Sequence, residues 1–197
     1  MKIIFITLTL ISIYFVFQSF ISINAFKTEK QKYRVVFKDA NVEIRFYPPA
    51  IMATIYAGAT NYKGLSNNGF RKLAGFIFGG NEQRESISMT APVRMKMSEK
   101  GSSMSFVMPE KYNAKTLPTP NDNNIQIQNS QPEYVAVISF GGYATDDKII
   151  SYKNKLEQIL EQRKIPILGD FSFLGYNAPF QIIGRTNEII IPVLWKE

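Results

Sequence analysis

The chain has 197 residues, with 23 Lys and Arg against 16 Asp and Glu, and it contains neither Cys nor His. The missing Cys excludes disulfides and thiolate metal sites, and the missing His removes the commonest general base and metal ligand. The positive charges are scattered along the chain, which indicates a basic soluble surface and no nucleic-acid site.

The first 25 residues are predicted to direct the chain to a membrane. An almost unbroken apolar run, residues 3–23, follows Lys2, and globular domains do not begin with such a stretch. Two interpretations are open. The segment is either a signal peptide cut near Ala25, which we favour, or a permanent anchor long enough to cross a bilayer. We therefore expect the domain to be exported (periplasmic or extracellular) or anchored at a membrane.

Polar residues 26–32 are predicted to be a tether, and residues 33–197 a single domain of ordinary size. The first strand of this domain alternates apolar and charged side chains, which is typical of a strand with one buried face. The inward set is expected to be Val42, Ile44 and Phe46, and the outward set Glu43 and Arg45.

The rest of the domain is predicted to repeat one order of elements. A second strand from residue 51 precedes a helix over residues 64–78, where apolar side chains recur at helical spacing. Two alternating runs and a loop rich in Pro, Asn and Asp come next. The same order then returns, and its predicted parts are strands at 125–128 and 134–140, a helix at 146–163, and closing strands at 180–183 and 188–194.

Matching residues in the two halves indicate an internal duplication, because they recur at a nearly constant spacing of about 85 residues. The pairs are Gly58 with Gly142, Ala91-Pro92 with Ala178-Pro179, and Met108-Pro109 with Ile191-Pro192. Two such units predict an α+β fold, a distorted antiparallel β-barrel of two similar ββαββ halves with one helix per half packed outside.

No catalytic constellation is present in the sequence. Pairs of a nucleophile with His are impossible, and Gly79-Gly80 follows a helix, whereas a phosphate-binding glycine loop opens one. Carboxylates such as Glu82, Glu85 and Glu188 show no spacing that selects a pair. We therefore predict that the protein is not an enzyme.

Several motifs in order resemble the SOUL family of heme-binding proteins, over nearly the whole chain from about Tyr33 to Val193. They are VEIRFYPP (42–49), FIFGGNEQRESIS before MTAPV (89–93), FVMPEKY (106–112), LPTPND (117–122), YVAVISFGGYA (134–144), and GYNAP with RTNEIIIPV (175–193). The resemblance implies a distorted barrel of two similar halves.

The resemblance also implies that heme or a related tetrapyrrole binds, without catalysis, in an apolar groove along the first helix, for capture, buffering or delivery. The residues implied are Asn68, Arg71, Lys72, Gly75 and Phe78. Arg71 and Lys72 would meet the propionates. Without His, the heme is held by contacts alone or weakly through Met or Tyr. Four methionines in strand patterns are instead expected to pack in the core: Met95, Met97, Met104 and Met108.

An alternative is a binding module for another apolar or amphipathic small molecule. The predicted barrel also resembles effector-binding domains of bacterial regulators, which usually carry a buried acidic residue in a cleft between similar halves. Such a cleft would favour this alternative, whereas a groove on the first helix only would favour heme.

Overall fold

The computed structural model describes residues 9–10, 12–14, 16, 28–58, 61–98 and 101–196. The apolar run predicted to meet a membrane lies mostly outside these ranges, so its cleavage or retention stays a prediction. Among the described residues, no helix is both long enough and apolar enough to span a bilayer.

The described residues of the domain form one antiparallel sheet of nine strands and two helices, which confirms the predicted α+β class. The strands are β1 (Arg34–Asp39), β2 (Val42–Tyr47), β3 (Ile51–Ala57), β4 (Val93–Ser98), β5 (Gly101–Val107), β6 (Ile125–Asn129), β7 (Glu133–Gly141), β8 (Ser172–Gly175) and β9 (Thr186–Pro192). The helices are α2 (Tyr62–Ile77) and α3 (Asp146–Gln162), close to the predicted ranges.

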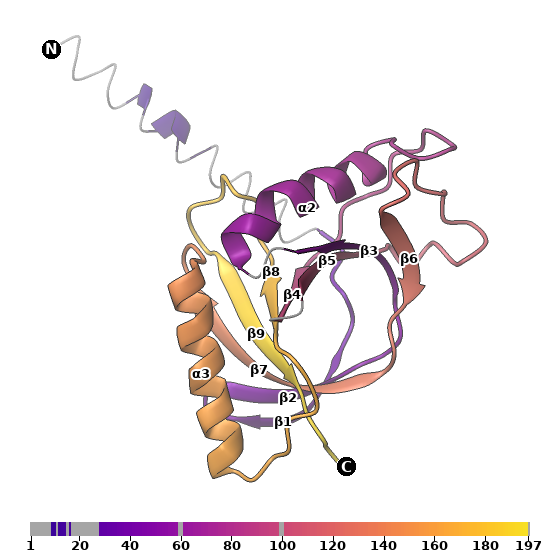
Figure 1. Cartoon of the computed structure of the whole chain (residues 1–197). Coiled ribbons are helices and arrows are strands. Elements are labelled where there is room, and N and C mark those ends of the chain that lie inside the picture. The colour runs from indigo at the N-terminus through magenta and orange to yellow at the C-terminus, as the bar shows by residue number, and fades with distance from the viewer. Residues whose placement is uncertain are drawn as a thin grey trace, which may run out of the picture.

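The sheet is curved but does not close, so the predicted barrel is wrong on this point (Figure 1). Its strand order is β1-β2-β7-β9-β8-β4-β5-β3-β6, and the two end strands have one neighbour each. A barrel would need the free edge of β1 to pair with β6. The β1 strand carries Arg34, Lys38 and Asp39, and its register with β2 shifts between Val35 and Phe37. Charges and bulges of this kind oppose edge pairing.

The strand order has a symmetry that agrees with the predicted halves. The unit β3–α2–β4–β5 forms the sheet order β4-β5-β3, and the unit β7–α3–β8–β9 forms the matching order β8-β9-β7. These units meet at β4 and β8. An origin by duplication stays a prediction.

One predicted strand, residues 180–183, is wrong. Phe180, Ile182 and Ile183 are exposed and lie in the loop between β8 and β9. The actual strand is β8, which pairs with both β4 and β9 and is buried on both faces. With four residues and two covered faces, β8 shows no alternation that would reveal it in the sequence.

Both helices cover the same face of the sheet and share one hydrophobic core with it (Figure 1). The α2 helix begins at the N-cap Asn61, whose side chain accepts a hydrogen bond from the Gly64 amide. Its Leu73 is fully buried, and its Gly69 lies so near Met104 that a Cβ there would be 3.3 Å from that side chain. The helix is therefore fixed on the sheet by its inner face, and its outer face is left to solvent.

Candidate functional site

The five residues predicted to bind a ligand, Asn68, Arg71, Lys72, Gly75 and Phe78, share the exposed side of α2 and its C-cap. Arg71 has no ion-pair partner among the described residues, and the nearest carboxylate to Lys72 is Asp122 at 4.0 Å. A Cβ at Gly75 would have nothing within 4 Å, and the Phe78 side chain is 67% exposed. The structure thus brings these residues onto one basic surface that is open at Gly75.

Exposed apolar side chains gather in the loop between β8 and β9, namely Phe180, Ile182 and Ile183. Arg185 holds this loop, because its guanidinium donates to the carbonyls of Ala178 at 2.8 Å and Gln181 at 2.6 Å. Burial raises the pKa of Tyr62 at the start of α2, and the charge of Arg185 opposes this shift.

The other face of the sheet contains a buried ion pair that was not predicted. Arg45 of β2 and Glu188 of β9 are 4% and 5% exposed, and both guanidinium NH groups donate to the carboxylate, at 2.9 and 3.0 Å. Tyr176 and Ser139 also donate to Glu188, at 2.7 and 3.1 Å. Arg45 therefore points to the face opposite Ile44, as the alternation predicted, but this face is also buried, so the expected exposure of Arg45 was wrong.

The hydrogen bonds explain why Arg45 stays charged while buried. Burial alone lowers the pKa of Arg45, but the hydrogen bond and the charge of Glu188 raise it above the ordinary value. Glu43 bonds the guanidinium at 2.8 Å, and the ring of Tyr33 lies 4.1 Å from it. These groups surround the guanidinium of Arg45. The ion pair of Arg45 and Glu188 therefore links β2 to β9 and leaves no unpaired charge for a ligand.

The phenols beside this pair are kept neutral. Burial raises the pKa of Tyr47 to about 12, and burial together with the charge of Glu188 raises the pKa of Tyr176 strongly. VEIRFY carries Glu43 and Arg45 among apolar residues, and TNEIIIP carries Glu188 directly before three isoleucines; these charges beside buried positions were the sequence signal for such a pair.

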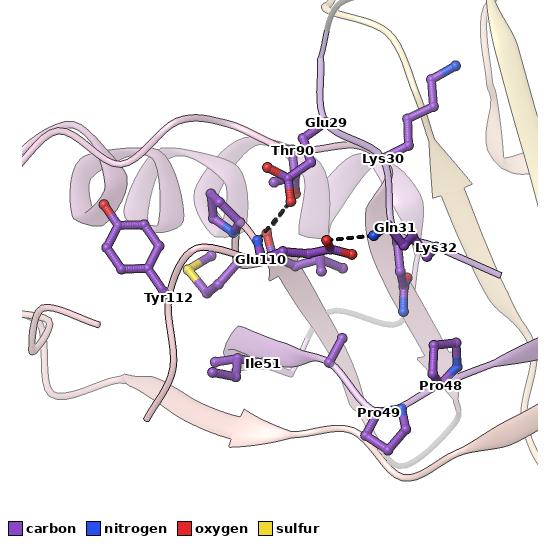
Figure 2. Close-up of a pocket in the computed structure, with 14 residues that line it drawn as sticks. Glu29, Lys30, Gln31, Lys32, Pro48, Pro49, Ile51, Thr90, Glu110 and Tyr112 are labelled. Atoms are coloured by element: carbon purple, nitrogen blue, oxygen red, sulfur yellow. Dashed lines mark hydrogen bonds and ion pairs between the residues drawn. The ribbon is translucent and has the colours of Figure 1, made fainter. Parts of the chain in front are cut away.

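Two cavities lie away from the predicted helix face. One of about 410 Å³ lies among residues 29–32, the turn at 48–51 and residues 107–112 (Figure 2). The other, of about 650 Å³, lies between the start of α2, the end of β4 and α3, with apolar and acidic walls. Its apolar side chains are Met97, Ile149, Ile150 and Phe171, and its acids are Asp146, Glu157 and Asp170.

The described part of the chain holds no group of three Asp, Glu, His or Cys side chains placed for a metal ion. The four strand methionines are buried in the core, as predicted. Iron in a ligand bound on α2 would therefore meet no imidazole or thiolate, since the sequence has neither. The helix-flanked sheet thus defines an α+β domain with a basic helix face and two cavities.

The chain belongs to the SOUL heme-binding protein family, whose model matches residues 28–192. Heme-binding protein 2 of Mus musculus is 30% identical over 155 residues, which cover 75% of each chain. Heme-binding protein 1 of Xenopus laevis is 30% identical over 132 residues, 63% of this chain and 68% of that one. The predicted family is thus confirmed.

Solved structures with little sequence identity share the fold alone. The C-terminal domain of EcmrR has a TM-score of 0.58 at 11% identity and covers 83% of this chain and 99% of that one. A structure titled as a hydrolase from Listeria innocua has a TM-score of 0.56 at 7% identity, with 81% and 94% covered.

Proposed function

We propose that this protein binds heme or a related tetrapyrrole without catalysing a reaction, and that it serves in capture, buffering or delivery. The observation that carries the proposal is the family match over residues 28–192, nearly all of the described domain. The relatives' names refer to binding of heme. The apolar run near the N-terminus supports a location of the protein outside the cytoplasm or at a membrane.

The proposed site is the exposed side of α2. A bound tetrapyrrole would supply a flat apolar ring with two carboxylates. Gly75 leaves space for such a ring, Phe78 offers an apolar edge, and Arg71 and Lys72 offer cations for the propionates. Asn68, one helical turn before Lys72, would donate or accept a hydrogen bond at the rim of the ring. These side chains fit the organic part of heme, and binding rests on them and not on an iron ligand from His or Cys.

A hemin titration of the full-length chain tests this function. We expect the Soret band to shift and to saturate at one equivalent of hemin. Arg71→Glu should weaken binding by about tenfold or more, because it opposes a propionate with like charge. Lys155→Glu is the matched control, since it makes the same charge change on exposed α3. Non-saturating partition of hemin, equal for all three chains, would contradict the proposal.

A second candidate function is binding of another amphipathic molecule, and the cavity of about 650 Å³ favours it. Both symmetric units line this cavity. Lys153 pairs with Glu157 at 3.0 Å and Lys96 pairs with Asp170 at 3.7 Å, which leaves Asp146 as the net charge of the cavity. Buried Glu188 is on the opposite face of the sheet and is neutralised by Arg45. The ligand expected here is therefore a lipophilic cation that meets Asp146 at the rim.

Two ions of the same shape separate this candidate from a nonspecific apolar site. Tetraphenylphosphonium should bind and tetraphenylborate should not, when both are measured by calorimetry. Asp146→Asn should weaken binding of the cation, whereas Asp147→Asn, an exposed neighbour on α3, should not. Equal binding of both ions would rule this candidate out and would leave the tetrapyrrole proposal untouched.

A further inference from the structure

The cavity of about 410 Å³ has a wall that the N-terminal segment provides. The Gln31 amide donates to the Ala91 carbonyl at 2.9 Å, and the Ala91 amide donates to the Glu29 carbonyl at 2.8 Å. Residues 29–31 thus lie parallel to the chain at Ala91, with Lys30 and Ala91 as a bridge. The segment predicted to be a tether is fixed here on the domain and encloses the space seen in Figure 2.

The charges at the rim of this cavity compensate one another. Lys32 pairs with Glu110 at 2.7 Å, and the Glu29 carboxylate accepts a hydrogen bond from the Glu110 amide at 2.8 Å. Two acids and two lysines line the cavity in total, with Lys30 as the second lysine. The rim therefore has no net charge that would select an ion.

The inner wall is apolar, and its polar backbone groups are mostly hydrogen-bonded within the protein. The carbonyl of Ile51 accepts from the Met108 amide at 2.8 Å, and the carbonyl of Val107 accepts from the Thr90 hydroxyl at 2.6 Å. Pro48 and Pro49 have no amide hydrogen to offer. The wall therefore presents hydrocarbon over most of its surface.

Gln31 is the exception. Its side chain is 9% exposed, and its Nε2 has no hydrogen-bond acceptor among the described residues. Figure 2 shows this amide extending from the N-terminal segment toward Pro48. Buried amide donors are nearly always hydrogen-bonded in folded proteins. The cavity thus combines apolar walls, a neutral rim and one buried donor in need of an acceptor.

We propose that this cavity is a second ligand site, for a small uncharged molecule with one carbonyl-type acceptor on an apolar body. The acceptor bonds Nε2 of Gln31, and the body packs against Pro48, Pro49 and Ile51. The volume lies near the lower end of the range for small-molecule sites, about 300–1,000 Å³, so the ligand is compact. The site is separate from the proposed tetrapyrrole surface and requires different chemistry.

Disulfide trapping on the full-length chain tests the site, because the natural sequence has no Cys. Pro49→Cys places a single thiol on the cavity wall. It is offered the symmetric disulfide of 2-(4-acetylphenyl)ethanethiol or of 2-(4-ethylphenyl)ethanethiol, which differ only in a carbonyl against a methylene. Exchange joins one half of the fragment to the cysteine and releases the other half as free thiol, and capture is read by intact mass spectrometry. We expect the ketone to be captured roughly 3- to 10-fold more, as one hydrogen bond allows.

Two controls test whether Gln31 causes the preference for the ketone. Lys155→Cys on exposed α3 should capture both fragments equally, which removes differences in thiol reactivity. Adding Gln31→Leu, or Gln31→Met if the first variant unfolds, to Pro49→Cys should abolish the preference. Equal capture at Pro49→Cys would overturn the proposal and leave water as the partner of Gln31. A preference that persists without Gln31 would overturn it as well, because the donor would then be another group.

Discussion

The two faces of the sheet are held by different physics. The helix-covered face is filled with apolar side chains such as Ile44, Ile138 and Ile189, which pack with Leu73 of α2 and Leu156 of α3. The opposite face buries a smaller apolar cluster together with the pair of Arg45 and Glu188. Apolar packing on the first face tolerates the loss of part of a side chain, whereas each buried charge on the second face is stable only with its partner.

The largest expected effect comes from breaking that pair. Glu188→Ala leaves Arg45 buried without its main partner, and should lower the free energy of unfolding by about 3–5 kcal/mol. The double variant Arg45→Met with Glu188→Leu should regain most of that loss. Urea unfolding of the three chains measures both effects. A double variant that is as unstable as Glu188→Ala, or less stable, would contradict the coupling.

On the helix-covered face, Leu73→Ala should cost about 2–4 kcal/mol, because it leaves a cavity in fully buried packing. Its loss should add to that of Glu188→Ala, since the two sites lie on opposite faces and share no partner. Strong non-additivity in urea unfolding would mean that the faces are not independent.

Alkaline pH should weaken the polar face selectively. Burial raises the pKa of Tyr47 to about 12 from the ordinary value of 10.0, so the neutral phenol is favoured in the folded state. Its stabilisation is complete below pH 10 and is lost as pH rises toward 12, by roughly 2 kcal/mol. Absorbance at 295 nm should show late-ionising phenols, and Tyr47→Phe should remove one of them. Ionisation of all tyrosines near pH 10 would contradict this prediction.

The smallest effect is expected from Glu133, which pairs with Arg94 at 2.5 Å where both side chains are partly exposed. Glu133→Gln should cost less than about 1 kcal/mol, because solvent screens the pair. If urea unfolding showed a loss of free energy comparable to that of Glu188→Ala, burial would not explain the difference between these two ion pairs.

The difference between the faces also explains what the sequence revealed. Helix α2 and the strand cores were predictable because apolar side chains recur at 3.6- or two-residue spacing toward one packed face. The burial of Arg45 was missed because its partner Glu188 is 143 positions away, and alternation alone cannot indicate a charge that is neutralised from another strand. The cavity at Gln31 was missed for a related reason, since a short polar segment has no sequence pattern that predicts its contact with Ala91.

The central claim is that a tetrapyrrole binds on the exposed side of α2. Paramagnetic hemin, added to the ¹⁵N-labelled full-length chain, tests it most directly, because Fe(III) broadens the amide signals near it. We predict that broadening centres on residues 68–78 and spares α3 and the cavity near Gln31. Broadening that centres on either of those regions, or that spreads evenly over the domain, would contradict the claim.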